Sequence, residues 1–169
     1  MSFDRFLAYA VGALSAVLVF ALLTTQAAPN EVGANRVAAD HMLELVNEVR
    51  AAEGLLPLES ADDIAEVAER WSAAMAADQD MRHNPSFADE ICCWQLATEN
   101  VAWSEPHRLW RPGDPVLRIT DELHEALLNS PGHRANLLDD AVDQIGIGVY
   151  VDGEGNVWIT QNFRRSLTE

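Results

Sequence analysis

The sequence predicts an α+β fold in which helices cover an antiparallel sheet. Two amphipathic helical patterns come first, strand patterns and further helices follow, and a hairpin closes the chain. A helix with one apolar face must bury that face against another element, and so must a half-apolar sheet. We therefore expect one domain whose core lies between the helices and the sheet.

The N-terminal residues predict export from the cytoplasm. The 18 residues of Phe6–Leu23 carry no charge, Arg5 precedes them, and small residues follow at Ala27 and Ala28. A signal peptide needs an apolar region of roughly 7–15 residues, whereas a spanning helix needs about 20. Residues 1–28 are thus expected to be a signal peptide or an uncleaved membrane anchor. The domain is then secreted and extracellular, or anchored outside the cytoplasm.

The charge of the chain limits its partners. The formal net charge is −16, which argues against nucleic acid and against adsorption to anionic lipid headgroups. Membrane contact is expected only through the N-terminal segment, if that segment stays uncleaved. We expect a monomer.

Two amphipathic helices are expected after a linker at residues 29–39. In the first, apolar residues recur at helical spacing from Met42 to Val49, and Gly54 ends the pattern. Ser60 or Asp62 is expected to cap the second. One face of the second helix carries Ile64, Val67, Ala68, Trp71 and Met75.

The middle of the chain predicts a strand and two helices. Residues 94–103 mix apolar and polar side chains and suit a strand. Residues 120–128 suit a helix with Thr120 as N-cap. In the following motif, Ser130 suits the N-cap and Pro131 the first helical position.

The tail predicts a β-hairpin. Residues 144–152 and 157–163 alternate in hydrophobicity, and the turn between them is rich in Gly and Asp. Gly146 and Gly148 fall on the face of the first strand opposite its apolar residues, so another element is expected to approach closely there.

Two further features allow more than one interpretation. Cys92 and Cys93 are adjacent, and buried small apolar side chains are favoured over a strained vicinal disulfide; a bridge to another chain and a role as metal ligands also stay open. Trp103 and Trp110 flank a Pro-rich loop. They suit core packing or loop anchoring, or the lining of a pocket for a flat apolar ligand.

The candidate site residues are His83, Glu99 and His133. Glu99 is a carboxylate on an apolar strand, which needs a partner when buried. His133 lies in the first turn of a helix, where the dipole favours the neutral imidazole. Two neutral imidazoles and a carboxylate suit a divalent metal, zinc first, with His83 and His133 as ligands. The same trio suits acid–base work around a water, and each histidine taken singly also suits a surface turn.

Several motifs, in order, resemble one family. The stretch "LVNEVRAAEGLLPL" is similar to the opening Asn-x-x-Arg helix of the CAP domain, the SCP domain of cysteine-rich secretory proteins, antigen 5 and pathogenesis-related 1 proteins. The stretches "MRHNP", "TENVAW", "NSPGHRANLLDDAVDQIGIGVYVD" and "WITQNF" resemble its later motifs, the third of them in its bacterial form. The resemblance implies a CAP domain over residues 40–165, with a tail at 166–169, and a three-layer α–β–α sandwich with a central antiparallel sheet.

The resemblance also implies a cleft that carries two His and two Glu. His83, Glu99 and His133 match three of these positions, while Ser130 stands at the place of the fourth and Glu125 lies about one turn earlier. The expected function is binding of a lipid or another apolar molecule beside a His pair that can hold zinc or another divalent cation. The alternative is a metal-assisted, peptidase-like hydrolase with Glu99 as general base. The missing fourth acid and the absence of a nucleophile motif favour binding.

Overall fold

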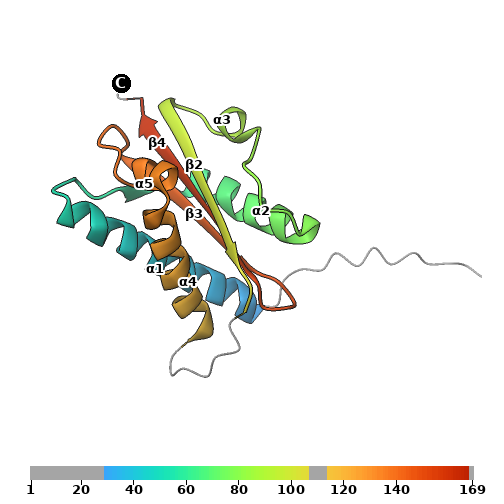
Figure 1. Cartoon of the computed structure of the whole chain (residues 1–169). Coiled ribbons are helices and arrows are strands. Elements are labelled where there is room, and N and C mark those ends of the chain that lie inside the picture. The colour runs from blue at the N-terminus through green and yellow to red at the C-terminus, as the bar shows by residue number, and fades with distance from the viewer. Residues whose placement is uncertain (1–28, 107–113, 168–169) are drawn as a thin grey trace, which may run out of the picture.

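The structure is a computed structural model that describes residues 29–106 and 114–167 (Figure 1). In chain order the elements are α1 (Pro29–Ala52), β1 (Glu59–Ser60), α2 (Asp62–Asp78), α3 (Phe87–Glu90), β2 (Trp94–Ser104), α4 (Pro115–Asn129), α5 (Pro131–Leu137), β3 (Gln144–Val151) and β4 (Val157–Ser166). The predicted α+β class is confirmed.

The sheet has the strand order β1-β3-β4-β2. The predicted hairpin β3–β4 forms its centre, and β2 pairs antiparallel with β4. The two-residue strand β1 pairs parallel with β3, so the sheet is mixed rather than wholly antiparallel. The long strand β2 lies at one edge, where loops and α5 can reach it.

Helices cover both faces of the sheet and produce the expected three layers (Figure 1). The helices α1 and α4 pack on one face, over a core that includes Ile145, Ile147 and Ile159. Helix α2 packs on the other face, directly over Gly146 and Gly148. A Cβ at either glycine would collide with the α2 backbone, which confirms the predicted close approach.

The buried face of α1 contains an arginine that ties two loops to the helix. Arg50 is only 2% exposed, and its guanidinium donates to the carbonyls of Leu56, Leu137 and Asp139 at 2.9 Å. Asn47, one turn earlier, exchanges two hydrogen bonds with the Leu58 backbone. These contacts give the Asn-x-x-Arg motif a structural role.

The starts of several helices differ from the predictions. Helix α1 begins at Pro29, so the expected linker at 29–39 belongs to it. Helix α4 begins at Pro115 and Asp114 caps it with its side chain, while Thr120 lies inside and bonds back to Val116. Proline at the first turn and an aspartate before it fix that start. Ala61 holds the N-cap position of α2, without a side-chain cap.

The two cysteines lie at the surface. Cys92 and Cys93 precede β2, and both are exposed and free, so the prediction of buried thiols is wrong. Cys93 has a φ of 62°, and its carbonyl accepts from the Leu167 N–H at 2.8 Å. The left-handed Cys93 lies directly before the edge strand β2.

None of the helices in residues 29–106 and 114–167 is long and apolar enough to cross a membrane. The expected signal peptide or anchor at 1–28 lies outside the described residues, as does Trp110.

Candidate functional site

The site begins in the loop that follows α2. Gln79 ends the helix in a left-handed conformation, and the chain then runs back along β2. The indole N–H of Trp71 donates to the Arg82 carbonyl at 2.8 Å, which fixes the loop one residue before His83. The position of His83 therefore depends on a tryptophan from the preceding helix.

Glu99, on β2, is the centre of the hydrogen bonding around this loop. Its Oε1 lies 2.8 Å from His83 Nδ1 and accepts from the Asn84 backbone N–H at 2.8 Å. The Asn84 side chain donates to Glu90, which also pairs with Arg70 of α2. The buried carboxylate on the apolar strand thus has the partner that its environment requires.

Asn100, the next residue of β2, points to the opposite face because side chains alternate along a strand. Its amide donates to the His133 carbonyl at 3.2 Å and to Gln161 at 3.1 Å. Asn136 of α5 donates to the Asn100 side chain at 2.9 Å and to the Glu99 carbonyl. These bonds attach α5, and therefore His133, to the strand that carries Glu99.

Burial dominates the electrostatics of Glu99. The side chain is 6% exposed, and burial raises the pKa of its carboxyl above the usual range, although hydrogen bonds from Asn84 and His83 oppose this shift. Its second oxygen, Oε2, is fully buried and has no partner among the described residues. The carboxyl thus contacts the loop rather than solvent.

His133 lies close enough to His83 to be affected by its charge. Burial lowers the pKa of the His133 imidazole, and the neighbouring His83 lowers it further. Burial and the charge of His83 therefore favour the neutral imidazole of His133. Ser130 is the N-cap of α5 and Pro131 its first residue, as predicted, yet the Ser130 side chain makes no capping bond.

The sequence of the domain matches a known family. Residues 43–163 match the cysteine-rich secretory protein family, CAP. The chain belongs to this family.

Two bacterial relatives resemble this CAP chain in sequence. The protein YkwD of Bacillus subtilis is 28% identical over 148 residues, which are 83% of this chain and 51% of YkwD. An extracellular SCP-domain protein of Bacillus anthracis is 27% identical with a TM-score of 0.64, over 83% of this chain and 45% of that protein. The chain spans about half the length of these relatives.

More distant structures share the fold alone. An outer surface protein of Borrelia burgdorferi has a TM-score of 0.62 at 18% identity, over 78% of this chain and 94% of that protein. NaASP2, crystallised with Zn²⁺, has a TM-score of 0.54 at 10% identity, over 75% of this chain and 78% of that one. The homologues include extracellular and outer surface proteins.

Few of the described side chains near Glu99 could contact a metal ion. Across the described parts of the chain, no three His, Cys, Asp or Glu side chains are grouped to hold one ion. Glu99 occupies Nδ1 of His83, and a zinc-binding histidine commonly gives its second nitrogen to such a carboxylate. The Nε2 of His83 and the ring of His133 are the remaining donors.

The structure brings the three predicted residues into one region and shows supports that were not predicted. Asn84, Asn100 and Asn136 lie in the family motifs, and a buried amide on an alternating strand is the signal that identifies Asn100. Glu125 is exposed on α4 and, within the described residues, forms no hydrogen bond or ion pair with the site.

Proposed function

We propose that this chain is a ligand-binding CAP protein, secreted or anchored outside the cytoplasm, whose His83 and His133 can hold zinc or another divalent cation. The observation that carries the proposal is the Glu99–His83 pair. The Oε1 atom of Glu99 already accepts two hydrogen bonds, and the Glu99 side chain is 6% exposed. Glu99 is then placed to orient His83, whereas a general base must reach a substrate or its water.

The ligand that we propose is a lipid or another apolar small molecule. Met81, two residues before His83, is 45% exposed, and the half-buried Trp71 lies under the same loop. These two side chains would supply apolar contacts to a ligand that lies beside the polar groups of the site. We propose a monomer without a nucleic-acid partner, in keeping with the charge of −16.

The metal part is tested by zinc titration calorimetry on the wild type and on His83→Ala and His133→Ala. We expect both variants to lose binding, because each removes one of two imidazole donors. Glu99→Gln should weaken binding by about tenfold or more, since it alters the partner that orients His83. His41→Ala, on α1, is the matched control and should bind as the wild type does; unchanged affinity in the first two variants contradicts the metal site.

The ligand part is tested by incubation with a lipid extract, repurification and mass spectrometry. Retention of an apolar molecule supports binding. The alternative function is a metal-assisted hydrolase in which Glu99 is the base and both histidines are ligands. Turnover of a peptide library that Glu99→Gln abolishes would replace the binding proposal with the hydrolase.

A further inference from the structure

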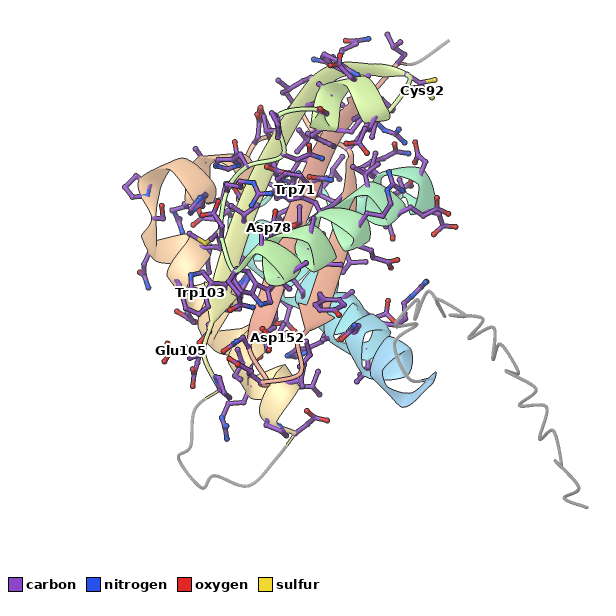
Figure 2. All side chains as sticks on the ribbon, turned by 90° about the vertical axis from the view of Figure 1, so that its right-hand side faces the viewer. Trp71, Asp78, Cys92, Trp103, Glu105 and Asp152 are labelled. Carbon is purple, nitrogen blue, oxygen red and sulfur yellow. The ribbon has the colours of Figure 1, made fainter. Side chains whose placement is uncertain are left out.

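We propose that the exposed face of Trp103, with the carboxylates of Glu105 and Glu154, binds an arginine side chain of a basic peptide. This surface, the Trp103 face, lies beyond the His83–Glu99–His133 site at the far end of β2. Figure 2 shows Trp71, Asp78, Trp103, Glu105 and Asp152 on one side of the molecule. The proposal does not depend on a metal or on an apolar ligand in the cleft.

Trp103 presents one ring face to solvent. Its inner face stacks on Trp158 of β4, with ring centroids 5.2 Å apart and planes at 16°. Trp158 is 2% exposed, whereas Trp103 is 39% exposed. Because Trp158 covers the inner face and holds the ring in place, the outer face is a rigid, flat surface that a planar cation can cover.

Two glutamates line a depression that follows Trp103 at the end of β2. Glu105 and Glu154 line one depression together with Pro106 and Asn156. Among the described residues, Glu105 and Glu154 use only backbone atoms in hydrogen bonds. Their side chains can therefore accept from a ligand.

The sheet register shows where the depression lies relative to the ring. Trp103 pairs with Trp158 and Ser104 with Val157, so the depression begins one residue further along both strands. Two residues of a strand span about 7 Å. An arginine whose planar guanidinium lies on the indole can thus point its N–H groups toward Glu105 and Glu154, and a planar fork of donors suits such an arrangement better than an ammonium does.

The protein already contains one arginine bound in this manner. The Arg82 guanidinium lies 5.1 Å from the centre of the Trp71 ring and pairs with Asp78 at 2.6 Å and Asp80 at 3.2 Å. The Trp103 face has the same ingredients, an indole and two carboxylates, without a described cation of its own. The chain therefore supplies an internal example of the recognition that we propose.

The wider charge distribution favours a basic partner. Asp152, whose carboxylate accepts from the Trp158 indole N–H at 3.2 Å, adds negative charge behind the stacked rings. The whole chain carries −16, which attracts a peptide with several positive charges and repels an acidic one.

The test is titration of the full chain with an acetylated, amidated peptide that contains two arginines, against the same peptide with citrulline. Citrulline keeps the shape and loses the charge. We expect the arginine peptide to bind and to shift the Trp103 indole N–H resonance, with roughly tenfold weaker binding of the citrulline peptide. The double variant Glu105→Gln/Glu154→Gln should lose a similar factor, and its substitutions are on the surface and leave the core intact.

Matched controls separate this site from general attraction between charges. Glu59→Gln/Glu66→Gln removes the same charge from exposed positions elsewhere, and Trp94→Ala removes an indole of similar exposure, 37%, from the other end of β2. Both should bind as the wild type does, as should His83→Ala. The proposal would be overturned if the wild type bound the two peptides equally or bound neither. It would also be overturned if Glu105→Gln/Glu154→Gln and Glu59→Gln/Glu66→Gln lost the same factor in affinity.

Discussion

Glu99 Oε1 and His83 Nδ1 lie 2.8 Å apart, although the Glu99 side chain is 6% exposed and that of His83 is 61% exposed. A buried carboxyl therefore orients an exposed imidazole. The strand supplies the buried carboxyl and the loop supplies the exposed imidazole. This division explains how a solvent-exposed histidine keeps one orientation.

Glu99→Gln should change how stability depends on pH. Burial raises the pKa of Glu99 in the folded protein, so its protonated form favours folding. That contribution is present below the unfolded value of 4.5 and is lost as the pH rises through the raised folded pKa. The free energy of unfolding of the wild type, relative to the variant, should therefore fall over this window in urea denaturation.

Glu59→Gln, an exposed carboxyl on β1, is the control for this pH series. Its free-energy difference from the wild type should show no comparable fall. A wild-type advantage over Glu99→Gln that grew with rising pH would mean that the hydrogen bonds from His83 and Asn84 outweigh burial.

Gly148→Ala should destabilise the domain strongly. The added Cβ would collide with the Ala68 carbonyl group of α2, and neither the helix backbone nor the central strand can yield cheaply. We expect a loss of roughly 3 kcal/mol in chemical denaturation. Gly153→Ala in the hairpin turn, where nothing lies within 4 Å, should stay near the wild type, and equal stability of the two variants would contradict the tight packing.

Asp152→Asn should destabilise the hairpin turn. Burial alone would raise the pKa of Asp152, but side-chain bonds from Asn156, Gln79 and Trp158 lower it to about 2. The carboxylate thus contributes stability above its usual value of 3.8, and this is lost as the pH falls toward 2. At pH 7 the variant should lose about 2 kcal/mol and should lack this acid-dependent fall, whereas the neighbouring Glu154→Gln should keep it.

His124→Leu should stabilise the protein in mild acid. His124 is 3% exposed on α4, and its ring nitrogens have no partner in the described residues. Burial lowers its pKa, against the pull of nearby acids. The free energy of unfolding is therefore highest above the ordinary pKa of 6.5, where the ring is neutral in both states. It decreases as the pH falls through the lowered pKa of the folded protein, because the buried ring must then take up a proton.

Denaturation between pH 7 and 5 measures this effect. The leucine variant should lose less stability than the wild type over that range and should be about 1 kcal/mol more stable at pH 7, since it removes unpaired nitrogens. His124→Gln also removes the titrating group but keeps a buried polar side chain. Its stability should therefore depend on pH as weakly as that of the leucine variant, without being higher than the wild type at pH 7. A wild-type pH slope in both variants would assign the titration to another group.

The local chemistry of the chain made the hairpin and most helices predictable. Alternation over 144–163 was sufficient for β3 and β4, because a half-buried strand repeats every two residues. The beginnings of α1 and α4 were missed, since Pro29 and Pro115 read as loop residues although proline suits a first helical turn. The prediction that Cys92 and Cys93 are buried was wrong. Their exposure depends on their position before the edge strand, and the adjacent sequence does not determine that position.

Periodicity and short motifs, which are local properties of the chain, were sufficient for the α+β class, the CAP family and the three candidate residues of the site. The contacts within that site needed the folded chain. Glu99 binds His83 and the Asn84 backbone, Asn100 fixes α5, and Trp158 covers one side of Trp103. Such contacts join residues distant in the sequence, and their formation depends on the packing of the layers and the register of β2 against β4.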